Sequence, residues 1–183
     1  MTTCIALLRG INVGRAKRIA MADLRALVER LGCTNVRTLL NSGNVVFDAT
    51  RPDRNRIAAA IDVALQSSHG FSASVVIITA AELQAIVEED PLAAVVIDPA
   101  RYLVAFVAEP ADLGRAKALL TAPWKPEAMA LGSRAAYLWC AKGIIDSKVL
   151  PAFVRATGQA ATTRNWSTVL KLQSLAGAGG DPA

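Results

Sequence analysis

Three short polar motifs hold the residues of this chain that could do chemistry. Each combines hydrogen-bond donors with residues that tolerate unusual backbone conformations or begin helices. Their candidate ligand-binding residues are Arg9, Gly10, Asn12 and Gly14 in the first motif, Ser42, Gly43 and Asn44 in the second, and Thr162, Thr163, Arg164 and Asn165 in the third. Guanidinium, amide and bare backbone N–H donors suit an anion better than they suit a core.

The first motif, residues 9–14, is typical of a loop that binds an anion. Gly10 and Gly14 let the backbone approach a ligand closely, and the basic residues Arg15, Lys17 and Arg18 follow. No Lys-Ser/Thr pair follows the glycines, and their spacing is not that of a dinucleotide-binding loop, so both nucleotide signatures are excluded. The structural alternative is a long connection with solvated charges.

The other two motifs also have structural explanations. Residues 41–44 are typical of a hairpin turn in which Gly43 takes a positive φ. Residues 162–165 are predicted to open the last helix, because threonine and asparagine are good N-caps. The same helix start would offer free N–H groups to an anion, with Arg164 as a bidentate partner. The alternative is an Arg164 that pairs with a local carboxylate.

Other reactive side chains have simpler structural interpretations. Ser147 and Lys148 could form a catalytic pair, but their context favours a loop and a helix start. Cys140 falls on a predicted buried strand, and His69, the one histidine, falls at a predicted helix end. The three cysteines lack the spacing of a metal site, so we expect reduced thiols, no metal and no cofactor.

Apolar periodicity predicts an α+β fold made of two ferredoxin-like βαββα subdomains with antiparallel sheets and an extra C-terminal helix. Predicted strands of the first half are residues 3–9, 36–40, 45–48 and 74–78, with 3–9 central; those of the second half are 102–108, 128–131 and 135–140. Predicted domains are residues 1–98 and 99–176, followed by a flexible tail, 177–183. The acidic run at residues 88–90 is expected to face solvent.

This topology has a consequence for the motifs. In a ferredoxin-like unit the first two strands are parallel, so the loop after the first strand and the turn after the second lie at one end of the sheet. Residues 9–18 and 41–44 are therefore predicted neighbours. Packing of the two halves could add residues 162–165, and we predict that all three motifs converge on one concave polar site.

Composition favours a globular protein with an anionic partner. The chain has 183 residues, 53% of them hydrophobic, and a formal net charge of +5. Residues 61–100 carry no basic side chain, so the positive charge lies in the segments that hold the motifs. No apolar run is long enough for a membrane span and no signal peptide is recognisable. We expect a cytoplasmic protein whose partner is a small anionic ligand or nucleic acid; the oligomeric state is not predicted.

The motifs resemble a known family. Residues 6–14, 42–47 and 161–172 closely resemble the bacterial family named domain of unknown function 1697, and the resemblance runs to about residue 175. It implies an α+β fold of ferredoxin-like halves and no established activity. Three positions depart from the family pattern, Arg15 in place of glycine, Asn41 in place of glutamine and Ala141 in place of proline, which affects the loop shapes.

The sequence leads to three hypotheses of function. The first is a binding protein for a phosphate-bearing ligand, either a nucleotide or nucleic acid. The second is an enzyme acting on a small anionic metabolite, for which no catalytic residue is assigned. The third is an interaction module that pairs through a sheet edge. Salt-sensitive binding to long DNA or RNA favours the polymeric form of the first hypothesis.

Overall fold

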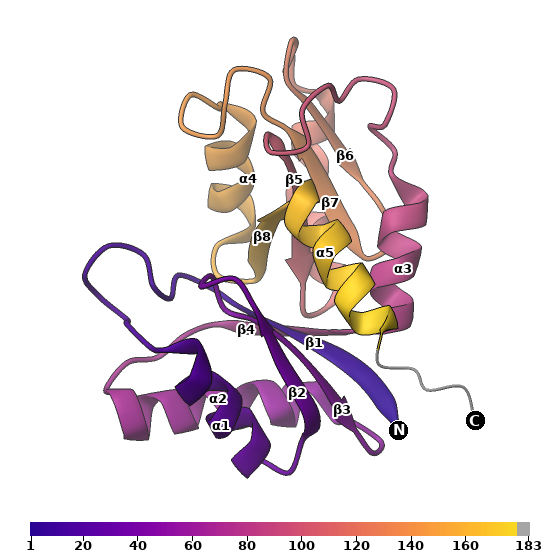
Figure 1. Cartoon of the computed structure of the whole chain (residues 1–183). Helices are drawn as coiled ribbons and strands as arrows, with labels where there is room; N and C mark the ends of the chain where they lie inside the picture. Colours follow the sequence, from indigo (N-terminus) through magenta and orange to yellow (C-terminus); the bar gives the residue numbers. More distant parts are fainter. Residues whose placement is uncertain (179–183) are drawn as a thin grey trace. The chain divides into compact units, whose positions relative to one another are not determined.

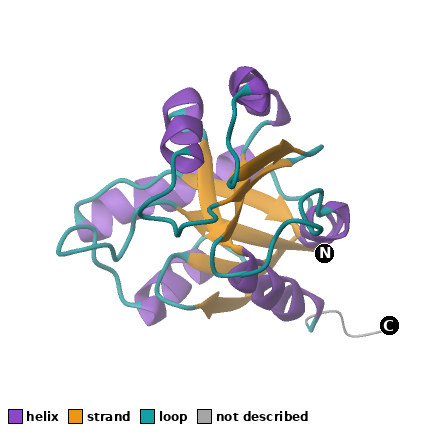
Figure 2. Cartoon of the chain, turned by 90° about the horizontal axis from the view of Figure 1, so that it is seen from above, coloured by secondary structure: helices purple, strands orange, loops and turns teal. Residues whose placement is uncertain are grey.

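A computed structural model describes residues 1–178 and contains two four-stranded antiparallel sheets with interleaved helices (Figure 1). The described chain forms two compact units, residues 1–81 together with 171–178, and residues 82–170. Both helices and strands are present in each unit (Figure 2). The predicted α+β class with two related subdomains is confirmed. No helix within residues 1–178 combines the length and apolar composition needed to cross a bilayer.

The first unit has the βαββαβ order of a ferredoxin-like fold. Its elements are β1 (Thr2–Leu8), α1 (Met21–Arg30), β2 (Thr34–Leu39), β3 (Asn44–Ala49), α2 (Arg54–His69) and β4 (Val75–Thr79). The strand order is β2-β3-β1-β4, with β1 antiparallel to both of its neighbours. The prediction of a central first strand is therefore confirmed, and β1 and β2 are parallel with β3 between them.

Burial explains why these segments fold as they do. Residues Cys4 to Leu8 of β1 are all fully buried, which fits a continuous apolar run in a central strand. The core of the unit combines alternate β1 residues with the inner faces of α1 and α2, for example Leu27 and Ile61. The side chain of Asp53 caps α2 by accepting from the Arg56 N–H at 3.0 Å.

The second unit repeats the pattern with a fourth strand that the sequence did not reveal. Its elements are α3 (Ala80–Glu89, which begins in the first unit), β5 (Tyr102–Val107), the 3-10 helix η1 (Pro110–Thr121), β6 (Ala128–Leu131), β7 (Ala135–Trp139), α4 (Val149–Thr157) and β8 (Ala161–Asn165). The strand order is β6-β7-β5-β8. The last helix, α5 (Trp166–Gly177), follows and continues into the first unit.

The third motif is a strand and not a helix start, so that part of the sequence prediction is wrong. Thr162, Thr163, Arg164 and Asn165 lie in β8, paired antiparallel with β5. β-Branched threonine fits a strand well, and ladder bonds to β5 outweigh the capping preference that the motif shares with helix N-termini. Asn165 alone caps α5, because its Oδ1 accepts from the Thr168 N–H at 2.9 Å.

Two further expectations about the second half need correction or completion. Glu88 and Glu89 are exposed as expected, whereas Asp90 is half-buried. Glu89 and Asp90 also accept hydrogen bonds from buried tyrosines. The Tyr102 hydroxyl donates to Asp90 Oδ1 at 2.6 Å, and the Tyr137 hydroxyl donates to Glu89 Oε2 at 3.0 Å. In the expected tail, Gly177 is still helical, and residues 179–183 lie outside the described residues.

Candidate functional site

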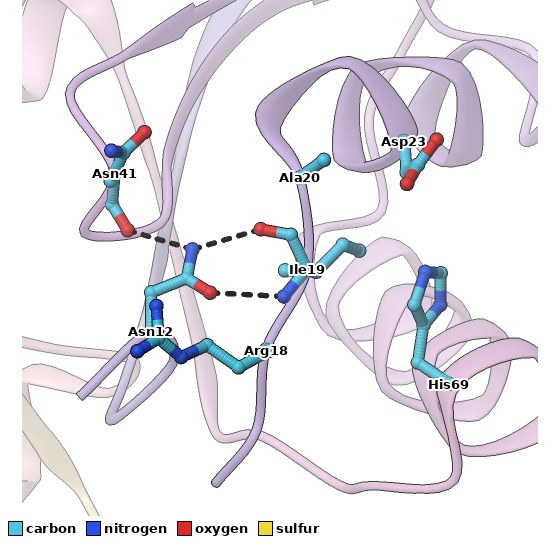
Figure 3. A pocket seen from close by; sticks show the side chains of 7 residues that line it. All are labelled: Asn12, Arg18, Ile19, Ala20, Asp23, Asn41 and His69. Atoms are coloured by element: carbon cyan, nitrogen blue, oxygen red, sulfur yellow. Dashed lines mark hydrogen bonds between the residues drawn. The ribbon is translucent and has the colours of Figure 1, made fainter. Parts of the chain in front are cut away.

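Asn12 ties the β1–α1 loop to the β2–β3 turn. Its Nδ2 donates to the carbonyl oxygens of Ile19 and Asn41, each at 2.9 Å, and its Oδ1 accepts from the Ile19 N–H at 2.9 Å (Figure 3). The residue has a left-handed φ of 55°, a conformation that asparagine tolerates better than most residues. The bonds to Ile19 join the two ends of the loop, and the bond to Asn41 joins the loop to the turn. The predicted proximity of the first two motifs is confirmed.

Gly43 allows the β2–β3 turn to pack closely against the end of β1 and the β1–α1 loop. Its φ is 77°, and a Cβ at this position would lie 2.8 Å from Leu8 Cβ and 2.9 Å from Ile11 Cδ1. The Leu8 N–H donates to the Gly43 carbonyl at 2.8 Å. Glycine is therefore needed here for both its backbone conformation and its missing side chain. The buried Asn44 amide donates to Leu39 O and Ser42 Oγ, each at 2.9 Å, which fixes the shape of the turn.

A cavity of about 440 Å³ lies beside this junction in the first unit. The β1–α1 loop, the start of α1, the turn and the end of α2 all contribute to its wall. Figure 3 shows the lining residues, which are Asn12, Arg18, Ile19, Ala20, Asp23, Asn41 and His69. The volume falls in the range of small-molecule sites.

The cavity carries groups of both charges. Arg18 and Asp23 are exposed, and neither makes a hydrogen bond or ion pair with another residue in the described part of the chain. The His69 ring is half-buried, with Nδ1 at 2.7 Å from Ser68 Oγ. Ala20 is the N-cap of α1 and has no side chain to accept from the first-turn N–H groups. The uncapped start of α1 and the Arg18 guanidinium both favour an anion, whereas Asp23, in the first turn of α1, repels one placed directly against it.

The remaining predicted residues of the first two motifs do not line this cavity. Gly10 and Gly14 take φ values of 68° and 63° with open space around them. The Arg9 backbone N–H donates to Ser74 O at 2.9 Å, which fixes the start of the loop. Among the candidate binding residues predicted from the sequence, Asn12 reaches the cavity, and both its amide hydrogens are already donated within the chain.

The third motif belongs to the second unit. Thr162 is buried, and Arg164 is only 9% exposed, with its Nη1 donating to Thr162 Oγ1 at 3.1 Å and to Thr163 O at 2.8 Å. Burial of the guanidinium lowers the pKa of Arg164 to about 10. These contacts give the motif a role within β8. Its convergence with the other two motifs stays a prediction.

Sequence reasoning missed most of the cavity wall. The sequence predicts Arg18 only as a basic residue that flanks the first motif, and it does not predict Asp23 or His69 as binding residues. A usable signal existed for His69. In a βαββαβ unit the first strand ends at one end of the sheet, and the first helix begins at that end. The second helix finishes at the same end. The end of α2 therefore had to lie near the β1–α1 loop.

The other reactive residues considered in the sequence have structural partners. Ser147 Oγ accepts from the Leu150 N–H at 3.1 Å, and Glu127 Oε2 accepts from the Lys148 N–H at 2.9 Å, so both support the start of α4. Cys4, Cys33 and Cys140 are buried, and none of them forms a disulfide within the described residues. Burial raises the pKa of the Cys33 and Cys140 thiols. Among the described residues no group of His, Cys, Asp and Glu side chains is placed to hold a metal ion.

Comparisons with known proteins identify a family and a fold. The model of the family described as "Protein of unknown function (DUF1697)" matches residues 1–137. No curated protein matches the sequence. The solved structure of conserved bacterial protein SP0830 from Streptococcus pneumoniae is similar, with 24% sequence identity and a TM-score of 0.76 over 96% of this chain and 98% of that chain. At this identity the likeness supports the fold.

Proposed function

The chain belongs to the DUF1697 family of proteins of unknown function, and we propose that it binds a phosphate-bearing anion in the cavity of its first unit. The observation that carries the proposal is the Arg18 guanidinium, which lines the cavity and has no partner among the described residues. An exposed guanidinium presents its donors in a fork that matches a phosphate or a carboxylate.

Three further features support an anion at this place. The start of α1 has no side-chain cap, and a helix N-terminus attracts negative charge. The half-buried His69 ring offers another donor on the cavity wall. Exposed Arg15 and Lys17 lie on the same loop and make its surroundings positive. Asn12 holds this loop in place, which makes it a positioning residue for Arg18.

A thermal-shift titration tests the proposal, since a ligand that binds only the native state raises the apparent stability. The probes are inorganic phosphate, mononucleotides and short oligonucleotides. We expect stabilisation of the natural protein and its loss in Arg18→Ala. Arg30→Ala is the matched control, because Arg30 lies at the opposite end of α1 and does not line the cavity. Equal responses of the two variants, or no response to any probe, would contradict the proposal.

A second candidate function is an enzyme acting on a small anionic metabolite. The observation that favours it is the presence of His69 and Asp23 in the same cavity as Arg18, because imidazole and carboxylate groups are the commonest general acids and bases. The candidate predicts turnover of a bound phosphate ester that His69→Gln abolishes while binding persists. Turnover that survives His69→Gln would reject this role.

We also propose a cytoplasmic location. Free phosphate esters are abundant inside cells, and none of the three cysteines forms a disulfide within the described residues, as is usual in a reducing compartment. Fractionation of cells that produce the protein would check the location, and recovery from the extracellular medium would contradict it.

A further inference from the structure

We propose that the ligand of this cavity is a phosphate ester of a hydroxylated sugar, with Arg18 on the phosphate and Asp23 on the sugar hydroxyls. The inference rests on the proposed function and names the class of ligand. It follows from the one acidic group in the cavity, which a site for a bare anion would not contain.

Asp23 is the reason to extend the ligand beyond its phosphate. An ionised carboxylate only accepts hydrogen bonds, and Asp23 has neither a donor nor a cation as partner in the described part of the chain. A phosphate placed against it would meet a like charge, which is unfavourable. A ligand that fills the cavity must therefore present donors to Asp23 and keep its anionic group near Arg18. Sugar hydroxyls are such donors, and a carboxylate is a frequent partner of ribose hydroxyls in nucleotide-binding folds.

The Arg18 guanidinium and the Asp23 carboxylate lie apart on the cavity wall (Figure 3). Figure 3 shows Asp23 and His69 on one side of the view and Asn12 and Asn41 on the other, with the guanidinium of Arg18 drawn beside Asn12. The Asn41 side-chain amide makes no hydrogen bond within residues 1–178. An amide both donates and accepts, so Asn41 suits a polar ligand with mixed groups and not only a charge.

The same observations favour a small molecule over a nucleic acid chain. A polynucleotide carries a phosphate at every step and binds through rows of basic side chains. A cavity that pairs one unpartnered arginine with one unpartnered carboxylate does not match a continuous row of phosphates. Its volume of about 440 Å³ suits a single sugar phosphate or mononucleotide.

Calorimetric titration with matched phosphate esters tests the assignment. The probes are methyl phosphate, which has no alcohol hydroxyl, ribose 5-phosphate and adenosine 5′-monophosphate. We expect ribose 5-phosphate to bind the natural protein about tenfold or more tightly than methyl phosphate, as hydrogen bonds to a charged group predict. Asp23→Asn should reduce that preference to below about threefold and should bind methyl phosphate at least as tightly. Tighter binding of the nucleotide than of ribose 5-phosphate would identify a nucleotide as the source of the sugar phosphate.

Control variants and contrary results keep the two proposals separate. Glu29→Gln removes a carboxylate of the same helix outside the cavity and should preserve the preference. Equal affinity for methyl phosphate and ribose 5-phosphate in the natural protein would overturn this inference and leave phosphate binding intact. A preference for ribose 5-phosphate that persists in Asp23→Asn would also overturn this inference. Tighter binding of oligonucleotides than of any monomer would overturn it too, and neither result would contradict phosphate binding. Absence of binding by every probe would overturn the proposed function as well.

Discussion

Replacing Asn12 by alanine removes the side-chain hydrogen bonds that close the β1–α1 loop and join it to the turn. Three bonds are lost, two with Ile19 and one with Asn41. At about 0.5–1.5 kcal/mol each, they contribute roughly 1.5–4.5 kcal/mol. Alanine at a φ of 55° adds about 1–2 kcal/mol of backbone strain. Because the loop can open locally while the sheet stays folded, the loss in global stability is at most this sum.

Asn12→Gly is the matched variant, since glycine adopts the left-handed conformation without strain. Urea denaturation gives the free energy of unfolding, and we expect Asn12→Gly to lose less stability than Asn12→Ala. Hydrogen exchange reports the loop directly, because the Ile19 N–H donates to Asn12 Oδ1. Its protection should fall in both variants, and phosphate binding should weaken because Arg18 is no longer positioned. A protected Ile19 N–H together with a stability change below about 0.5 kcal/mol in Asn12→Ala would refute this reasoning.

Further outcomes follow from three buried features. Gly43→Ala places a Cβ at a positive φ and within 2.8–2.9 Å of other side chains, so it should lower the free energy of unfolding in urea by about 2 kcal/mol or more. Gly10→Ala is the control, because its Cβ meets open space, and it should lower that free energy by about 1 kcal/mol. Similar losses in the two variants would contradict the packing argument. Cys140 is fully buried and burial raises its thiol pKa, so a thiol reagent should label it slowly in the native state. Fast labelling would contradict this prediction and would indicate a reactive thiol. Burial, with the nearby carboxylates, raises the pKa of Tyr102 and Tyr137. Their neutral forms therefore stabilise the fold fully below about pH 9, before unfolded tyrosine with its pKa of about 10 ionises, and less as pH rises, by up to about 1.4 kcal/mol per pH unit for each. Tyr137→Phe should flatten that decline in urea titrations between about pH 9 and 11, and an unaltered decline would show that other groups cause it.

The sequence was sufficient for the sheet of the first unit because its signals are local and agree with one another. The apolar run of β1, the stripe on α1 and the glycine turn between β2 and β3 each favour one structure. Strand direction then placed the loop beside the turn, and the bond from Asn12 to Asn41 bears this out. This agreement across levels is what makes a fold predictable.

The incorrect sequence predictions have one physical cause in common. In each case the structure of the segment depends on a partner that is distant in the sequence. Threonines at residues 162–163 favour both a helix cap and a strand, and pairing with β5 selects the strand. Asp90 ends an acidic run that is typical of a solvated surface, but it is half-buried because the Tyr102 hydroxyl donates to it. The cavity wall likewise joins side chains from separate elements, so Asp23 showed no sign of a role in its local sequence.

A nuclear magnetic resonance titration of backbone amides with ribose 5-phosphate tests the central claim most directly. The claim is that the cavity bounded by the β1–α1 loop, the start of α1, the turn and the end of α2 binds a phosphate-bearing ligand. The account predicts saturable shifts of the amides of residues 18–23, Asn41 and His69, with no such shifts in Arg18→Ala. Saturable shifts confined to other surfaces, or no shifts with this or any other phosphate ester, would contradict the account.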